Sequence, residues 1–270
     1  MNRHLGFIGA GNMAEAIARG VLASGLYRAP EILAGDVSPQ RRDLFADQLK
    51  IRAIDQAIPV ITQSQIILLC VKPQQVPDLL ASIREFVTEG HLLITIAAGI
   101  STRYIQESLS PDRKLRVVRA MPNTPMLVGQ GMVAICPGAN ATSQDMTDAR
   151  KIFQSAASVV EVQESQMDAV TAVSGSGPAY FFFLVEQMIQ AGIELGLSPE
   201  AAHQLATRTA LGSATMLCNS ADAPAELRRK VTSPGGTTLA AITHMQQHHM
   251  PQTVIDAIKA AAHRSQELGK

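Results

Sequence analysis

A glycine-rich turn between a buried strand and a helix constrains this chain most strongly. Gly9-Ala-Gly-Asn-Met-Ala14 follows the apolar run Leu5–Ile8 and leads into residues with helical periodicity through Val21. In a G-x-G-x-x-A turn, the first glycine permits a tight bend and the second lets backbone approach a pyrophosphate, while the alanine keeps helix and strand close. The turn therefore predicts a dinucleotide bound at the helix N-terminus.

Short apolar runs alternate with helical patterns over the first half of the chain. Such runs are typical of strands buried on both faces of a parallel sheet. Helices are expected to begin at Ser38-Pro39 and after Lys72-Pro73. The alternation predicts an α/β fold in which residues 1–164 form a Rossmann-type doubly wound sheet. Strands are expected at Leu5–Ile8, Ile32–Ala34, Ile66–Val71, Leu92–Ile96, Leu115–Val118, Met132–Ile135 and Val159–Val162.

The second half, residues 165–270, is predicted to be all-α. Its stretch Ala179–Val185 contains three consecutive phenylalanines and is apolar almost all round, so this helix must be buried on several sides. It is either the central helix of a compact bundle or a helix shared in a dimer core. Helices are expected from Pro178, from Ser198-Pro199 to about Leu217, and over Glu226–Val231, Thr237–Gln247 and Gln252–Leu268.

Composition argues against several classes of partner. Lys plus Arg and Asp plus Glu both number 23, so charge does not favour nucleic acid or an acidic membrane surface. The chain has no apolar run of the roughly 18 residues that suggest a membrane span, and a predicted strand starts too early for a signal peptide. The odd, widely spaced cysteines Cys70, Cys136 and Cys218 suit reduced thiols in a cytoplasmic protein better than disulfides.

The cofactor preference depends on the end of the second strand. Asp36 stands there, and an acid at this position suits the free ribose hydroxyls of NAD(H). Ser38, Arg41 and Arg42 follow at once; they would suit the 2′-phosphate of NADPH, although the arginines fit a solvated helical turn equally well. Both NADPH and NADH therefore stay open as the cofactor.

Three further strand ends carry residues that fit a binding site. Val71-Lys-Pro73, Ala97-Ala-Gly99 and Met121-Pro-Asn-Thr-Pro125 each follow a predicted strand, and ligands of open α/β sheets bind at the carboxyl ends of strands. Lys72 would contact cofactor or substrate, or be a structural lysine. Asn123 would hydrogen-bond the cofactor, or only stabilise its proline-flanked turn.

The helical half has two glycine-rich turns. Ser174-Gly-Ser-Gly-Pro-Ala-Tyr180 is either a helix connection or a site of close backbone approach. Val231-Thr-Ser-Pro-Gly-Gly-Thr-Thr238 leads into a helix start that is rich in hydroxyl groups and open N–H donors, which makes it a candidate anion site. The seven histidines show no metal-like or triad-like spacing, so no metal site is predicted.

Together, these motifs resemble pyrroline-5-carboxylate reductase over the whole chain. The resemblance rests on Phe7–Met13, the three strand-end motifs and the two glycine-rich turns, of which the turns Ser174–Tyr180 and Ser233–Thr238 are the most specific. It implies an all-α C-terminal dimerisation domain, with self-association as a dimer or a ring of dimers. It also implies hydride transfer from NAD(P)H to the C=N carbon of 1-pyrroline-5-carboxylate, giving L-proline.

The resemblance also assigns roles to residues. Thr238 would hydrogen-bond the imine nitrogen as the catalytic residue, and the substrate carboxylate would meet N–H groups of the turn that precedes it. The expected substrate-binding residues are Ser233, Gly235, Gly236, Thr237 and Ser176. The expected cofactor-binding residues are Ile8, Gly9, Ala10, Gly11, Asn12, Met13, Asp36, Val71, Lys72, Pro73, Ala97, Ala98 and Asn123.

The chain departs from the family pattern at two positions. Ala57 stands where many members have an asparagine that reaches the adenosine ribose, and Asp36 replaces a small or amide residue. Both bear on cofactor preference. Two alternatives are a two-domain hydroxyacid-type dehydrogenase, which would need a catalytic lysine or histidine, and a non-catalytic NAD(P)-sensing protein.

Overall fold

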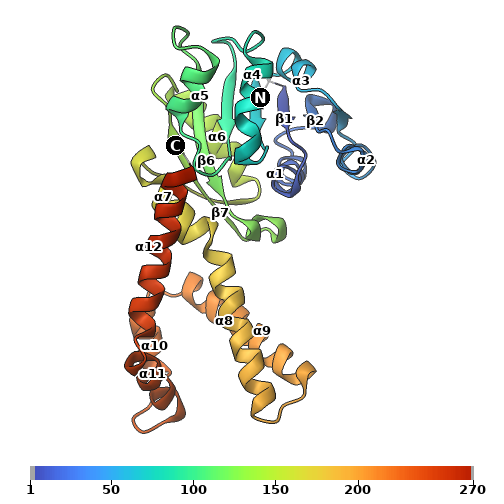
Figure 1. Ribbon diagram of the computed structural model, residues 1–270. Helices are drawn as coiled ribbons and strands as arrows, with labels where there is room; N and C mark the ends of the chain where they lie inside the picture. The colour runs from blue at the N-terminus through green and yellow to red at the C-terminus, as the bar shows by residue number, and fades with distance from the viewer. Residues whose placement is uncertain (1–3, 269–270) are drawn as a thin grey trace. The chain divides into compact units, whose positions relative to one another are not determined.

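The computed structural model describes residues 4–268 and contains one twisted sheet (Figure 1). Within these residues the sheet has eight strands in the order β3-β2-β1-β4-β5-β6-β7-β8. Neighbouring strands are parallel except for β6 and β7, which are antiparallel. The strands are β1 (Leu5–Ile8), β2 (Ile32–Gly35), β3 (Arg52–Ile54), β4 (Ile66–Leu69), β5 (Leu92–Thr95), β6 (Arg116–Pro122), β7 (Gly131–Pro137) and β8 (Ala157–Glu161).

Helices cover both faces of this sheet. Successive strand residues point to opposite faces, so Phe7 and Ile8 of β1 belong to different apolar clusters. The Phe7 cluster takes in α1 (Asn12–Ala23), α2 (Pro39–Asp47) and α6 (Ser143–Gln154). The Ile8 cluster takes in α3 (Ile58–Gln63), α4 (Val76–Ile83) and α5 (Thr102–Leu109). This arrangement confirms the predicted doubly wound fold.

The position of β1 in the sheet locates the binding edge. The chain runs from β1 to β2 and β3 on one side, and then crosses over to β4 on the other side of β1. Ligands of open α/β sheets bind at such a reversal, beyond the carboxyl ends of the strands. The fold therefore places the end of β1, with Gly9 and Gly11, at the switch point.

Every predicted strand is present, and the pattern misses only β3 among the described strands. β3 is a short edge strand whose residues Arg52–Ile54 are exposed or half-buried, so it lacks the continuous apolar run of its neighbours. The predicted strand Ile66–Val71 ends earlier, at Leu69. Two predicted caps are confirmed: the Ser38 hydroxyl accepts from the Arg41 N–H at the start of α2, and the Ser198 hydroxyl accepts from Ala201 at the start of α9.

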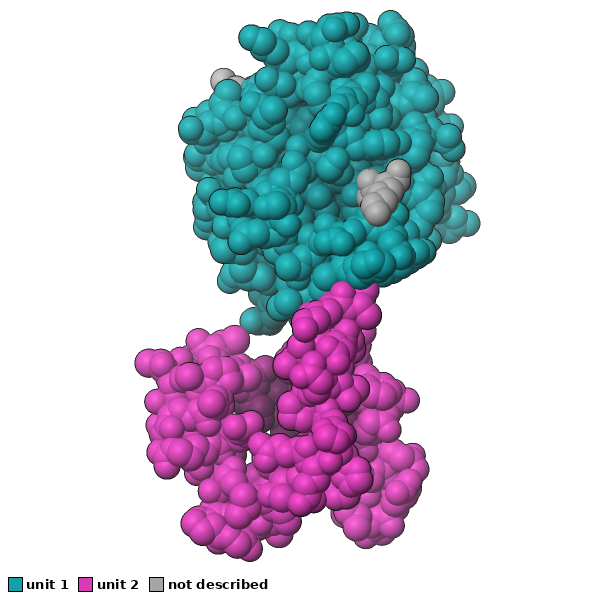
Figure 2. Space-filling view, turned by 60° about the vertical axis from the view of Figure 1, so that its left-hand side comes forward, with its two compact units in different colours: residues 1–176, 261–270 teal, residues 177–260 magenta. Residues whose placement is uncertain are grey.

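The chain divides into two compact units, which Figure 2 distinguishes by colour. Unit 1 is Met1–Ser176 with Ala261–Lys270, and unit 2 is Gly177–Ala260. Unit 1 therefore also includes α7 (Met167–Val170) and a π-helical turn, η5 (Thr171–Gly175). Met167 is buried against Ala134 and Cys136 of β7, which keeps this segment with the sheet. The predicted domain limit after residue 164 stays a prediction.

Unit 2 is helical, as predicted, but it buries very little of its own surface. Its only fully buried described residues are Gly177, Ala202 and Ala206. Phe181, Phe182 and Phe183 are 59%, 68% and 65% exposed, so the phenylalanine-rich helix is not the core of a self-contained bundle. The helices are α8 (Gly177–Glu194), α9 (Pro199–Asn219), α10 (Pro224–Lys230), α11 (Thr237–Gln247) and α12 (Met250–Leu268), whose end belongs to unit 1.

Among the described residues, no helix is both long and apolar enough to cross a membrane.

Candidate active site

The turn after β1 requires glycine at two positions for different reasons. Gly9 has φ +93°, and a Cβ there would lie 2.8 Å from the Cys70 carbonyl group at the end of β4. A Cβ on Gly11 would meet no atom within 4 Å. Gly11 is the N-cap residue of α1 and offers no side-chain cap, so the first N–H groups of this helix are open to a ligand. The turn thus forms a cradle that fits a dinucleotide pyrophosphate.

Asp36 lies against this turn. Its Oδ2 accepts a hydrogen bond from the Ala10 N–H at 2.6 Å, and its Oδ1 accepts from the Ser38 N–H at 2.8 Å. The two bonds fix the carboxylate between the end of β2 and the glycine-rich turn. The structure thus brings three predicted residues, Gly9, Ala10 and Asp36, to one place.

Both arginines that follow Asp36 donate to protein oxygens. Arg41 donates from Nε to the Ala10 carbonyl and forms an ion pair with Glu15 of α1 at 2.9 Å. Arg42 donates from Nη1 to the carbonyls of Asp36 and Val37. Burial tends to raise the pKa of Glu15, but hydrogen bonds from Arg19 and Arg41 outweigh it and hold that pKa below its usual value.

The ends of β4 and β5 carry the next predicted residues. Val71 and Pro73 are half-buried, whereas Lys72 is exposed and its backbone N–H donates to the Gln75 side chain. Ala97 is buried and its N–H donates to the Thr95 hydroxyl at 3.2 Å. Small residues at the end of β5 leave room for a flat ring to approach.

Asn123 hydrogen-bonds at both ends of its amide. Its Oδ1 accepts from the Met132 N–H at 2.9 Å, which stabilises the turn between β6 and β7. Its Nδ2 donates to Ser174, in the π-helical turn η5. The next residue, Gly175, lies against Met121. The second of the two sequence interpretations of Asn123, a turn-stabilising role, is therefore observed, while a binding role for the Ser174–Tyr180 turn stays a prediction.

A second glycine-rich helix start lies in unit 2. Gly235 has φ +69°, and Gly236 lies so close to the Ser233 side chain that a Cβ would collide with it. Gly236 is the N-cap residue of α11 and offers no side-chain cap, so the first N–H groups of this helix are open as well. Thr238 is half-buried in the first turn of α11, while Ser233 and Thr237 are exposed. The predicted anion site is thus a helix N-terminus with no side-chain cap, and the Gly236 N–H just before it donates to the Ser233 carbonyl at 3.1 Å.

The predicted residues fall into two groups. Those expected to bind the cofactor lie in unit 1, at the carboxyl ends of β1, β2, β4, β5 and β6, and Ser176 also belongs to unit 1. Ser233, Gly235, Gly236, Thr237 and Thr238 belong to unit 2. Among the described residues, no cluster of three or more His, Cys, Asp or Glu could hold a metal ion.

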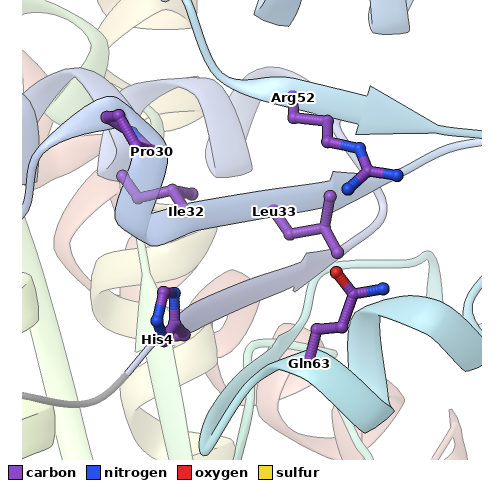
Figure 3. Close-up of a pocket in the computed structure, with 6 residues that line it drawn as sticks. All are labelled: His4, Pro30, Ile32, Leu33, Arg52 and Gln63. Atoms are coloured by element: carbon purple, nitrogen blue, oxygen red, sulfur yellow. The ribbon is translucent and has the colours of Figure 1, made fainter.

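Two surface cavities lie elsewhere in unit 1. One of about 350 Å³ is lined by residues at the amino ends of β1, β2 and β3, including His4, Leu33 and Arg52 (Figure 3). The other, of about 390 Å³, lies beside Thr102 and Glu164 near the start of α5. None of the predicted site residues lines either cavity.

Two site residues escape prediction from the sequence. Glu15 is visible as an i,i+4 partner of Arg19, but its pairing with Arg41 spans 26 positions. Ser174 stands in a predicted motif, yet its bonds with Asn123 span 51 positions. Such long-range partners leave no periodic signal in one sequence.

Comparison with known proteins agrees with this geometry. A family model described as pyrroline-5-carboxylate reductase dimerisation matches residues 164–268, and one described as NADP oxidoreductase coenzyme F420-dependent matches residues 4–99. The chain is 40% identical to a pyrroline-5-carboxylate reductase of Synechocystis over 100% of both chains. It is 34% identical to that of Escherichia coli, again over 100% of both.

The chain belongs to the pyrroline-5-carboxylate reductase family.

Solved structures of the family have the same fold. The pyrroline-5-carboxylate reductase of Coxiella burnetii is 32% identical over 100% of both chains, with a TM-score of 0.91. The enzyme of Plasmodium falciparum, solved with NADP bound, is 30% identical over 100% of this chain and 99% of that one, with a TM-score of 0.88. The resemblance and the two-part fold class predicted from the sequence are therefore confirmed.

Proposed function

We propose that this protein reduces 1-pyrroline-5-carboxylate to L-proline with NADPH or NADH, the last step of proline biosynthesis. The observation that carries the proposal is the uncapped start of α11 after Gly235 and Gly236. It offers open N–H donors to one small anion, as the single carboxylate of this substrate requires. The family that the chain belongs to is named for the same reaction.

Residues of the α11 turn bind and orient the substrate in this proposal. The N–H groups of Gly235 and Thr237 and the Ser233 hydroxyl bind the carboxylate, next to Gly236, whose own N–H donates to the Ser233 carbonyl. The Thr238 hydroxyl faces the ring nitrogen and hydrogen-bonds its proton, which makes the C=N carbon the better hydride acceptor. Ser176 adds a hydroxyl to the substrate site. Catalysis is then mostly placement of two reactants.

The glycine-rich turn of unit 1 holds the dinucleotide. The open N–H groups at the start of α1 bind its pyrophosphate, and Asp36 lies at the adenosine ribose. Val71, Lys72, Pro73, Ala97, Ala98 and Asn123 line the strand ends toward the nicotinamide. When bound, the reduced cofactor supplies the hydride, so that the C=N bond becomes CH–NH with one proton gained on nitrogen.

The helical unit 2 is proposed to associate with a second copy of the chain. The exposed phenylalanines of α8 need a partner surface, and the family model over residues 164–268 is that of a dimerisation domain. We propose a dimer, or a ring of dimers, whose core includes α8. The free cysteines Cys70, Cys136 and Cys218 fit a location in the cytoplasm.

A direct assay tests the proposal. Purified protein should oxidise NADH or NADPH only after 1-pyrroline-5-carboxylate is added, with L-proline formed in equal amount. Absence of turnover with both cofactors would reject the reductase. Dinucleotide binding without turnover would instead favour the non-catalytic sensor.

A further inference from the structure

The charged residues around the end of β2 bear on which dinucleotide binds there, an inference that rests on the proposed function. Asp36, Glu15, Arg41 and Arg42 surround the turn that would hold the adenosine half of the cofactor. We propose that Asp36 and Glu15 make NADH the preferred hydride donor, Asp36 by binding the free ribose hydroxyls and Glu15 by ion-pairing with Arg41.

Asp36 acts first on the ribose itself. Backbone N–H groups of Ala10 and Ser38 hold one carboxylate oxygen each, and each oxygen keeps a further lone pair for a hydroxyl donor. A free 2′-hydroxyl can donate to such an oxygen. A 2′-phosphate brings only acceptor oxygens and negative charge, so Asp36 repels it.

Glu15 acts by occupying Arg41. The guanidinium donates from Nε to the Ala10 carbonyl and from Nη2 to Glu15 at 2.9 Å. The side chains of Arg41 and Glu15 are only 23% and 16% exposed, so water screens this ion pair less than it would an exposed one. Glu15 thereby balances the positive charge that Arg41 would otherwise offer to a phosphate.

Arg42 does not take over that role in this arrangement. Its Nη1 donates to the carbonyls of Asp36 and Val37 at 2.8 and 3.0 Å, so its guanidinium is turned toward main-chain oxygens. Both guanidinium groups at this strand end are thus bound to the protein, while a carboxylate lies against the glycine-rich turn. That arrangement suits a ribose without a phosphate.

Equilibrium binding of NADH and NADPH to the intact protein, followed by the fluorescence of the reduced nicotinamide, tests the inference without turnover. The wild type should bind NADH at least about tenfold more tightly, the size of one hydrogen bond to a charged group. Asp36→Ser should reduce the ratio of the NADPH dissociation constant to the NADH dissociation constant. Glu15→Gln keeps the shape but removes the charge, and should tighten NADPH binding by about tenfold.

A double variant makes the test of Glu15 specific. The gain from Glu15→Gln should vanish in Glu15→Gln/Arg41→Leu, because it depends on the positive charge of Arg41 that Glu15 no longer balances. Glu31→Gln is the matched control, since it breaks a comparable ion pair, with Arg28 at 2.9 Å, at the opposite end of β2. The ratio of NADPH to NADH dissociation constants in this variant should equal that of the wild type.

Several results would overturn the inference. They are tighter binding of NADPH by the wild type, an unchanged ratio in Asp36→Ser, or a gain in Glu15→Gln that survives removal of Arg41. Preferential binding of NADH by a protein without reductase turnover would support the inference and reject only the proposed function. Failure to bind either dinucleotide would reject both.

Discussion

The side-chain amide of Asn123 donates to the carbonyl oxygen and to the hydroxyl oxygen of Ser174, both at 3.3 Å. These bonds join the end of β6 to the π-helical turn before α8. Turns of this rare type occur often at functional sites, and Ser176 lies at the end of this one. Asn123 therefore positions the Ser174–Ser176 turn and also stabilises the turn between β6 and β7 in which it stands.

Two substitutions separate the roles of Asn123. Asn123→Asp keeps an oxygen for the Met132 N–H but has no donor for Ser174, whereas Asn123→Leu loses both sets of bonds. If the link to Ser174 positions the site, kcat/KM for 1-pyrroline-5-carboxylate should fall in both variants. Only Asn123→Leu should also lose about 1–3 kcal/mol of stability for the unpaired Met132 N–H, measured by denaturant unfolding. Wild-type activity in Asn123→Asp would contradict the positioning role.

The two glycines of the dinucleotide turn should respond in opposite ways to alanine. Gly9→Ala places a Cβ at φ +93° and 2.8 Å from backbone, so it should cost about 1–3 kcal/mol of folding stability. Gly11→Ala meets no protein atom, so stability should hold while dinucleotide affinity falls. Thermal unfolding and cofactor titration of both variants check this contrast. Equal dinucleotide affinity in Gly11→Ala and the wild type would show that the pyrophosphate does not bind at this turn.

Thr238 should affect turnover more than cofactor affinity. Thr238→Ala removes the hydroxyl proposed to face the imine nitrogen, and kcat should fall by about a hundredfold or more if the hydroxyl assists proton transfer. Thr238→Ser restores a hydroxyl and should recover much of the rate. Steady-state kinetics with both variants decide the matter: an unchanged kcat in Thr238→Ala excludes the residue from the mechanism.

The exposed phenylalanines of α8 should determine the oligomeric state. Phe182→Glu puts a charge on a side chain that is 68% exposed in the single chain. In a monomer this change would be nearly neutral, but in a dimer core it buries an unpaired charge. Light scattering should show loss of the dimer together with a lower unfolding temperature. Wild-type size and stability would place Phe182 outside any interface.

Cys136 should be inert in the folded protein. Burial raises the pKa of its thiol from 9.0 to about 12, and the negative charge of Glu164 adds to the effect. The thiolate is thus disfavoured in the folded state, and alkylation at mildly alkaline pH should occur only after unfolding. Because the pKa is raised on folding, this thiol's contribution to stability is complete below pH 9 and is lost as the pH rises toward about 12. Rapid alkylation of native Cys136 would contradict its burial.

The sequence predicts local features of this fold well, because they depend on near neighbours. Gly9 and Gly11 are recognisable from the strand before them and the helix after them, and Ser38 and Ser198 from the prolines that follow. Residues that meet across long stretches of chain escape prediction. The partners of Asn123 and Glu15 are set by the order of strands in the sheet, and β3 carries too little apolar pattern to reveal its place there.

The end of α12 belongs to unit 1, where Ser265 is 3% exposed and donates to Asp168 at 2.7 Å. Unit 2 is therefore an insertion, and the chain re-enters the sheet-bearing unit after completing it. A simple N-terminal fragment that ends at residue 176 would lack part of unit 1, the segment whose Ser265 donates to Asp168. An expression design that isolates the dinucleotide-binding unit must therefore keep residues 261–268 together with residues 4–176.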